Sequence, residues 1–150
     1  MQLIKEIGIF ETFPVRQIVL RPGKPVESCH FDGDDLHTTH HYGLFNDNKV
    51  VAVITVLENQ LKDFDMQRQF QVRGMAVLDE FRGKGYGEDL LLYTENQIKS
   101  QNGELIWFNA RITAVGFYEK SGYQTLGPAF EIADVGQHYI MFKQLNASDI

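Results

Sequence analysis

The sequence is poor in cysteine, in basic residues and in long apolar runs, and each shortage excludes a class of protein. The single cysteine, Cys29, makes an internal disulfide impossible and argues against a cysteine-based zinc site. The formal net charge is −6 at pH 7, so a general phosphate-binding surface for nucleic acid is not expected. No run approaches the roughly 18 apolar residues that span a bilayer, and the N-terminus lacks a signal-peptide core. We therefore expect a cytoplasmic protein that binds neither nucleic acid nor membrane.

The length and composition fit one globular domain. The chain has 150 residues, of which 43% are hydrophobic and 23% are charged, as in ordinary soluble proteins with one core. No repeat, low-complexity tract or linker divides it. Residues 1–150 are therefore interpreted as a single domain.

The hydrophobic pattern predicts strands and helices along most of the chain. Helices are expected from about Thr12 to residue 20, over 88–100, and from a Thr113 cap to Ser121. The tripeptide N-D-N at 46–48 has hairpin chemistry, and the apolar run 105–110 is typical of a strand buried on both faces. The expected strands are 1–7, 40–45, 49–57, 70–78, 105–110, 123–132 and 138–145. Together they predict a mixed sheet with helices packed on it.

Two glycine features stand out in this pattern. Gly74 lies inside the expected strand 70–78, where glycine commonly marks a bulge or a close approach of another group. The hexapeptide R-G-K-G-Y-G at 82–87 then joins that strand to a helix. In such a unit the loop N–H groups and the helix N-terminus converge on one point, which favours an anion, and Arg82 and Lys84 add positive charge. The alternative is a tight turn without a ligand.

Two better-known phosphate motifs do not fit the hexapeptide. A P-loop needs Ser or Thr after Gly-Lys, but Gly85 follows Lys84. It also needs a glycine five positions before Gly83, and that position is Leu78. A dinucleotide fingerprint needs G-x-G-x-x-G, but these glycines are spaced G-x-G-x-G. Neither motif therefore accounts for the hexapeptide, and an anion site of another kind and a tight turn without a ligand both stay open.

The hexapeptide resembles the Q/R-x-x-G-x-G/A signature of the GNAT superfamily of acyl-CoA-dependent N-acetyltransferases. The segments R-G-M-A-V at 73–77, W-F-N-A-R at 107–111, F-Y-E-K-S-G-Y at 117–123 and G-Q-H-Y-I-M at 136–141 resemble adjoining family segments in the right order. The resemblance runs from about residue 40 to the end. It implies an α/β (α+β) fold with a mixed, mostly antiparallel sheet, a splayed strand pair, and helices on both faces.

The resemblance also implies how acetyl-CoA binds. The splayed strands would leave a cleft in which pantetheine bonds to the backbone of Met75, Ala76 and Val77 beside Gly74. The pyrophosphate would then rest on the N–H groups of Arg82, Gly83, Lys84, Gly85, Tyr86 and Gly87. Side chains at the glycines would block this approach, which explains both glycine features.

The same resemblance implies a catalytic acid. Tyr118 matches the tyrosine that faces the thioester sulfur, with Phe117 beside it at the coenzyme, and its phenol is protonated at neutral pH because its reference pKa is about 10. The helix pattern by itself would make Tyr118 a half-buried structural residue. Asn109 matches a residue that contacts pantetheine or ties the strand end to the next helix, and both roles stay open.

The general base departs from the family pattern. Many members carry a glutamate on the strand equivalent to 70–78, where this chain has Gln69, Gln71 and Arg73. The remaining candidates are His138, His40, His41, Glu58 and Asp134, and the base can also act through water. We take His138 as the base because histidine titrates in the useful range, with a structural role as the alternative.

No metal is expected. In H-T-T-H-H at 37–41 the histidines lie in a loop that enters a strand, where they do not converge. D-G-D-D at 32–35 lacks the calcium-loop pattern and is interpreted as a solvated turn.

The sequence thus predicts an enzyme that transfers an acetyl group from acetyl-CoA to a primary amine by direct attack. The alternative is a non-catalytic acyl-CoA-binding sensor or partner-binding module, which the missing strand glutamate favours and Tyr118 disfavours. The acceptor is expected to be a small-molecule or peptide amine. Dimers are common in the family, so the resemblance allows a homodimer, but the sequence itself does not determine the oligomeric state.

Overall fold

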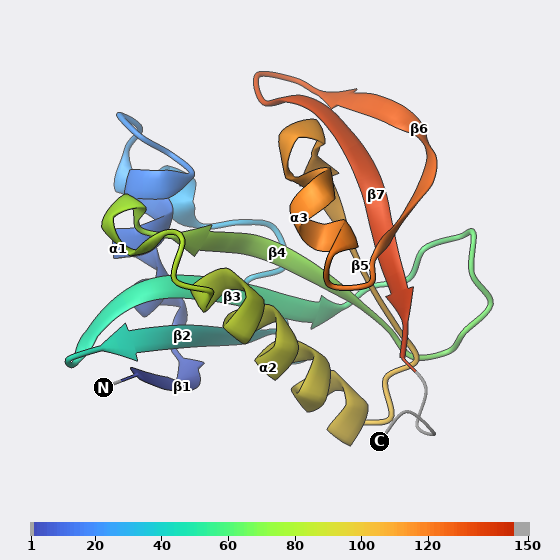
Figure 1. Ribbon diagram of the computed structural model, residues 1–150, viewed down its shortest axis with the longest axis horizontal. Helices are drawn as coiled ribbons and strands as arrows, with labels where there is room; N and C mark the ends of the chain where they lie inside the picture. The colour runs from blue at the N-terminus through green and yellow to red at the C-terminus, as the bar shows by residue number, and fades with distance from the viewer. Residues whose placement is uncertain (1, 146–150) are drawn as a thin grey trace. The chain divides into compact units, whose positions relative to one another are not determined.

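The computed structural model describes residues 2–145, and these residues form two compact units. The first unit consists of residues 2–58 and 72–97, and the second of residues 59–71 and 98–145. Among the described residues, seven strands form a sheet in the order β1-β2-β3-β4-β5-β7-β6 (Figure 1). Strand β4 (Gln69–Val77) begins in the second unit and ends in the first. That both units fold as one domain stays a prediction.

The first unit is built on an antiparallel meander. Strand β1 (Gln2–Ile7) pairs with β2 (His40–Asn46), which pairs with β3 (Lys49–Glu58). The two residues between β2 and β3, Asp47 and Asn48, have φ angles of 51° and 69°. Two successive positive φ angles match the twist of a tight hairpin, and Asp and Asn tolerate them well. The predicted hairpin is therefore confirmed.

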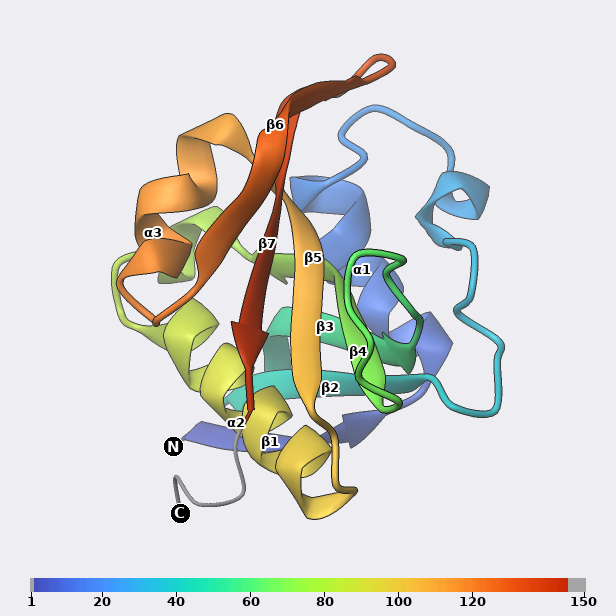
Figure 2. The ribbon, with the colours of Figure 1, turned by 90° about the vertical axis from the view of Figure 1, so that its right-hand side faces the viewer.

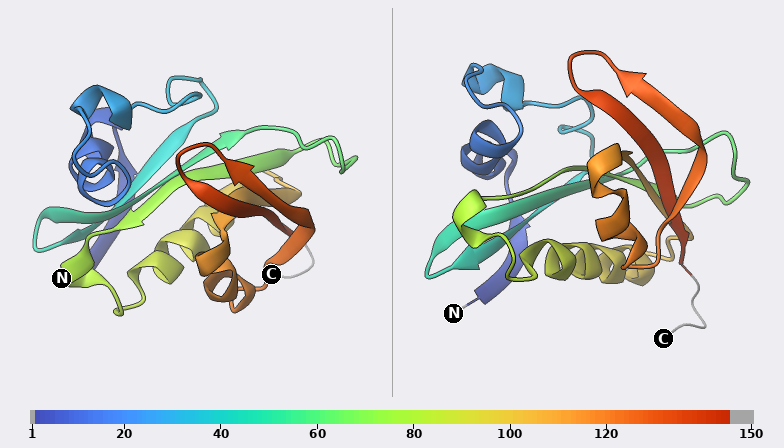
Figure 3. Two further views of the ribbon diagram at one scale, coloured as in Figure 1. Left: turned by 90° about the horizontal axis from the view of Figure 1, so that it is seen from above. Right: turned by 45° about the horizontal axis from the view of Figure 1, so that its top comes forward.

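Two helices cover opposite faces of the first unit's strands, as the left view of Figure 3 shows. Helix α1 (Ile9–Val19) packs with β3 and buries Thr12, Val15 and Arg16. Helix α2 (Tyr86–Ser100) covers the other face. Its buried residues are Tyr86, Leu90, Leu91, Thr94, Glu95 and Ile98. The ring of Tyr93 meets that of Tyr42 edge-on at 5.2 Å. The burial of Arg16 in α1 is unusual, because arginine is almost never fully buried unless it is paired.

Helix α1 begins earlier than predicted. Thr12 and Pro14 looked like its start, but Gly8 is the N-cap and Pro14 lies inside the helix. The Glu11 carboxylate accepts a hydrogen bond from the Gly8 N–H at 2.9 Å, so the glutamate completes the cap without a Ser, Thr, Asp or Asn at the cap position. The sequence signal failed because the capping group lies three residues after the cap.

The second unit contains the last three strands. Strand β7 (Gly136–Gln144) lies between β5 (Leu105–Arg111) and β6 (Gln124–Ile132) and is antiparallel to both (Figure 2). Residues 105–108 are buried, as predicted for a central strand. Strand β5 also pairs in parallel with β4, over Gln69–Gln71 only, although β4 continues to Val77. Such a short pairing is the one expected of a splayed strand pair.

Within residues 2–145, three short 3₁₀ helices join these elements, and one of them corrects a predicted cap. They are Val26–Cys29, Asp79–Phe81 and Ile112–Ala114. Helix α3 (Val115–Glu119) follows the third directly, so its N-cap is Ala114, and no side chain caps it. The Thr113 cap was therefore wrong, because the chain is already helical there. Gly122, at φ 94°, follows α3 as predicted.

The architecture is the predicted mixed α/β fold with a mostly antiparallel sheet and helices packed on it. In the described chain β4 pairs with β5 in parallel, whereas the pairs β1–β2, β2–β3, β5–β7 and β6–β7 are antiparallel. Within residues 2–145, no helix combines the length and the apolar character needed to cross a membrane.

Candidate active site

The glycine loop leads from β4 to the N-terminus of α2 in the first unit. Gly83 and Gly85 have φ angles of 78° and 81°, a conformation that L side chains rarely adopt. A Cβ built on either glycine meets no atom within 4 Å. The two positions therefore present bare backbone to open space at the start of a 15-residue helix, as an anion-binding loop requires. Gly87, in contrast, already lies within α2.

The side chains of the loop divide into exposed and anchoring ones. Arg82 and Lys84 are exposed, and the Arg82 Nε lies 3.1 Å from Oδ1 of Asp79. Tyr86 is buried and its ring stacks on Phe81 at 6.2 Å. The Tyr86 side chain therefore anchors the loop. A ligand could contact the backbone of Tyr86 but not its buried phenol.

Gly74 has a positive φ just before the backbone that, by the family resemblance, would contact pantetheine. Its φ is 60°, inside β4, and a Cβ there would lie 3.0 Å from Cε2 of Phe31. Glycine is thus required both by conformation and by contact. Met75 and Val77 are half-buried and Ala76 is buried, so this segment combines partial exposure with strand geometry.

Tyr118 belongs to an aromatic cluster of the second unit. Its ring centroid lies 4.4 Å from that of Phe108, 5.1 Å from that of Phe117 and 6.3 Å from that of Tyr123. Burial raises the pKa of the Tyr118 phenol to about 12, because the phenolate would lose its hydration. The phenol therefore keeps its proton throughout the physiological range, as a proton donor must.

His138 lies at the start of β7, and its side chain is mostly enclosed, with the residue 4% exposed. Its Nδ1 lies 2.8 Å from the carbonyl oxygen of Gly136. A carbonyl only accepts, so Nδ1 donates, and in the neutral ring Nε2 then carries the lone pair. The ring is tilted by 33° against Phe130 at 6.0 Å. This geometry fixes the tautomer that a base acting through Nε2 needs, and it equally satisfies a structural histidine.

Asn109 is exposed in β5, opposite Ile140 of β7. Within residues 2–145 its side chain makes no hydrogen bond. The described structure therefore gives no support to the role of tying the strand to the next helix, and the amide stays available to a ligand.

The other base candidates lie in different surroundings. The His40 Nδ1 lies 2.7 Å from a Glu6 oxygen, Glu58 is half-buried, and Asp134 is exposed in the β6–β7 turn at φ 65°. His41 is buried. No group of three metal-binding side chains occurs in the part of the chain that the structure describes.

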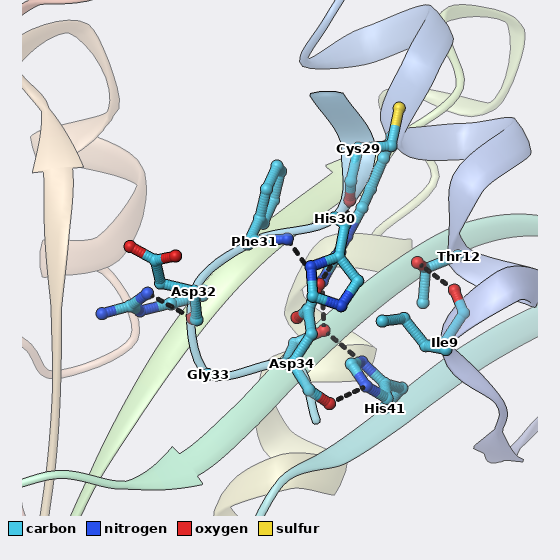
Figure 4. Close-up of polar contacts among 12 residues, drawn as sticks. Ile9, Thr12, Cys29, His30, Phe31, Asp32, Gly33, Asp34 and His41 are labelled. Atoms are coloured by element: carbon cyan, nitrogen blue, oxygen red, sulfur yellow. Dashed lines mark hydrogen bonds and ion pairs between the residues drawn. The ribbon is translucent and has the colours of Figure 1, made fainter. Parts of the chain in front are cut away.

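A buried ionic cluster around Arg16 was not predicted from the sequence. Figure 4 shows two of its members, Asp34 and His41. Arg16 and Asp34 are 0% and 5% exposed. Arg16 Nη1 donates to Asp34 Oδ2 at 2.7 Å and Nη2 donates to Oδ1 at 3.1 Å. Nη1 also donates to the Cys29 carbonyl at 2.8 Å, and Nη2 to the Thr55 hydroxyl at 2.8 Å. The D-G-D-D segment is thus not a fully solvated turn, because its third residue is a buried ion-pair partner.

The cluster also fixes the protonation of its acid and its histidine. Burial would raise the pKa of the Asp34 carboxyl, but hydrogen bonds from Arg16 and the Phe31 N–H, with the Arg16 charge, outweigh it and lower that pKa. Burial lowers the pKa of His41, against the bond to the Asp34 carbonyl and the Asp34 charge, which raise it, so its ring is neutral at pH 7. Its Nε2, 3.3 Å from the Asp34 carbonyl, then donates, and its Nδ1 accepts from the Thr55 hydroxyl at 2.7 Å. His41 is therefore a structural group rather than an accessible base.

Comparison with known proteins identifies the family. Residues 32–140 match the family described as "Acetyltransferase (GNAT) domain", so the chain belongs to the GNAT acetyltransferases. It is 28% identical over 145 residues to the "uncharacterized N-acetyltransferase YitI" of Bacillus subtilis, covering 97% of each chain.

Solved structures agree with this assignment at the level of the fold. One is a Lactobacillus plantarum protein provisionally assigned as an N-acetyltransferase, with a TM-score of 0.78 and 20% identity over 97% of this chain and 99% of that one. Another is an aminoglycoside 6′-N-acetyltransferase complexed with coenzyme A, with a TM-score of 0.74 and 14% identity over 95% and 96%. The family and fold predicted from the sequence are confirmed.

Proposed function

We propose that this GNAT acetyltransferase transfers an acetyl group from acetyl-CoA to a primary amine in the cytoplasm. The observation that carries the proposal is the loop of Gly83 and Gly85, whose bare backbone faces open space at the N-terminus of α2. Its exposed N–H groups fit a pyrophosphate, and Arg82 and Lys84 supply positive charge in a chain of net charge −6. The acceptor amine is a small molecule or part of a peptide, and the working form is proposed to be a homodimer.

The chemistry needs few groups. When bound, acetyl-CoA supplies an activated carbonyl carbon, to which the amine nitrogen bonds as the bond to sulfur breaks. The backbone of Met75, Ala76 and Val77 in the first unit is proposed to hold the pantetheine. For Asn109 and Phe117 of the second unit, the family resemblance implies contacts with the coenzyme. Tyr118 gives its proton to the departing sulfur. His138 Nε2 takes the proton that the amine loses, so protons balance between the two side chains.

A coenzyme A release assay over a panel of primary amines tests this function. We expect turnover with at least one amine, and thermal stabilisation by acetyl-CoA through mass action. Stabilisation without turnover on any amine would instead establish the non-catalytic sensor that the missing strand glutamate favours. Neither stabilisation nor turnover would overturn both functions.

Tyr118→Phe tests the acid. The change keeps the ring in its aromatic cluster but removes the proton donor, so we expect kcat to fall by about 10² to 10⁴ while the Kd for acetyl-CoA stays within about twofold. Stopped-flow kinetics and calorimetry measure the two quantities. Tyr123→Phe, in the same cluster, serves as the control. Equal turnover of Tyr118→Phe and the unaltered enzyme across pH would assign Tyr118 to structure.

His138→Gln tests the base. If Nε2 accepts the amine proton, His138→Gln loses much of the rate of the unaltered enzyme. The acetyl-CoA affinity stays the same. A variant with a lower Tm, an unchanged pH profile and normal turnover per folded molecule would show that His138 only bonds to the Gly136 carbonyl.

A further inference from the structure

Three arginines gather around the Phe31–Asp32 segment of the first unit. The Cζ atoms of Arg16 and Arg21 lie 4.1 Å and 4.7 Å from the centroid of the Phe31 ring. Arg73 comes from β4, and its Nη1 donates to the Asp32 carbonyl at 2.6 Å. Figure 4 shows Phe31 and Asp32 in the loop that also carries Asp34. The sequence separates these groups, and only the fold brings them together.

The three guanidinium groups differ in how their charge is balanced. Asp34 neutralises Arg16. Arg73 and Arg21 are half-buried, and each makes a single hydrogen bond among residues 2–145, to the carbonyls of Asp32 and Leu20. An arginine carries five N–H donors, so most of these two sets of donors are unused. The exposed Asp32 carboxylate also forms no ion pair within residues 2–145. The charges of Arg73, next to Gly74 in the sequence, and of Arg21, on the Phe31 ring, thus form no ion pair among residues 2–145.

We propose that the acceptor is an amine that also carries a carboxylate, such as a small amino acid, and that Arg73 binds this carboxylate. The proposal rests on the proposed function, because Arg73 stands directly before Gly74 and the Met75–Val77 backbone assigned to the acyl chain. The guanidinium fork matches a carboxylate in two parallel hydrogen bonds, and the Asp32 carbonyl holds one edge of it in place. Arg21, whose Cζ lies 4.7 Å from the Phe31 ring centroid, adds a second positive charge at the same segment.

A positive charge at this position also suits the chemistry. The acceptor attacks as a neutral amine, and a like charge nearby disfavours the ammonium form, so its pKa falls. A carboxylate on the same molecule provides the binding energy that a cationic amine alone would lose by repulsion. The two effects together select acceptors that carry both groups and disfavour polycationic amines.

The test compares each of several amino acids with its own amide, which keeps the amine and removes the negative charge. The ratio of kcat/KM for acid over amide is the measured preference. We expect the unaltered enzyme to prefer the acid, and Arg73→Gln to lower the preference about 10- to 100-fold, the range for a hydrogen bond to a charged group. Arg73→Lys should keep part of it. Lys49→Gln, which removes one exposed charge at the β2–β3 hairpin, serves as the control and should keep all of it.

Failure of the proposal differs from failure of the function. No acetylation of any amine would overturn the function, whereas turnover with equal kcat/KM for acid and amide would overturn only the carboxylate proposal. Should Arg73→Gln not fold, two measurements decide. The acid preference of the unaltered enzyme should fall as salt rises from about 0.05 to 0.5 M, because added ions screen partly exposed charges. Arg21→Gln should lower the acid preference several-fold. If neither added salt nor Arg21→Gln changes the acid preference, the proposal is overturned.

Discussion

The glycine loop and the Arg16 cluster are two polar regions of one compact unit, and they are built in opposite ways. The loop is contiguous, spans residues 82–87, is mostly exposed, and relies on backbone conformation. The cluster draws on α1, β2, β3 and the segment between α1 and β2, and its side chains are almost fully buried. A contiguous region serves a ligand that approaches from solvent. A dispersed region holds chain segments to one another.

Gly74 is where the cluster reaches the strand that leads to the loop. A Cβ there would lie 3.3 Å from Arg16 Nε, in addition to its contact with Phe31. The Arg16 cluster therefore packs against β4 at Gly74. This position directly precedes the backbone that, by the family resemblance, would contact pantetheine. If this division is right, changes in the cluster affect stability first, and changes in the loop affect ligand binding first.

The largest expected effect is that of Arg16→Met. Removing one partner leaves the Asp34 carboxylate buried without its counter-charge, which costs about 3–5 kcal/mol of the free energy of unfolding. Urea denaturation measures it, and Lys49→Met gives the cost of the same change at an exposed position. A loss below about 1 kcal/mol would show that the cluster is not a stabilising centre.

The next effect concerns Gly85→Val, with Gly23→Val as a matched control. Both glycines have positive φ, 81° and 74°, and at both a Cβ meets no atom within 4 Å, so the intrinsic strain is alike. At a ligand concentration of 100 Kd, acetyl-CoA stabilises a folded protein by about 2.7 kcal/mol. We expect Gly85→Val to lose most of this increment and Gly23→Val to keep it, in thermal denaturation with and without acetyl-CoA. Equal increments in both variants would separate the loop from phosphate binding.

The smallest effect is the acid sensitivity that His41 brings. Its pKa in the folded protein lies below the reference value of about 6.5, so its contribution to stability is complete above that pH and is lost as the pH falls through the folded value. Each differential proton changes the free energy of unfolding by at most about 1.4 kcal/mol per pH unit. His41→Gln should flatten the stability profile just below pH 6.5, whereas exposed His37→Gln should not. Parallel profiles for the two variants would contradict the buried, neutral assignment.

The sequence by itself predicted the features whose physical cause is local. The Asp47–Asn48 hairpin, the loop of Gly83 and Gly85 and the buried β5 follow from backbone preferences and hydrophobic pattern over a few adjacent residues. The family resemblance added the order of the motifs, which the comparisons confirm. The start of α1 and the Thr113 cap were wrong, because the backbone groups at a helix end can be satisfied without the expected cap residue.

Only the tertiary structure decided which polar residues are buried, and against what. Asp34 is separated from Arg16 by 18 positions and Thr55 from Arg16 by 39, so no local pattern could pair them. The raised pKa of Tyr118 likewise comes from burial among rings of different elements. The Arg73 guanidinium donates a hydrogen bond to a carbonyl that lies 41 residues earlier in the chain. Burial changes the energy of a charge by several kcal/mol, whereas sequence neighbours in water change it by a fraction of that. The chemistry of these side chains is therefore a property of the fold.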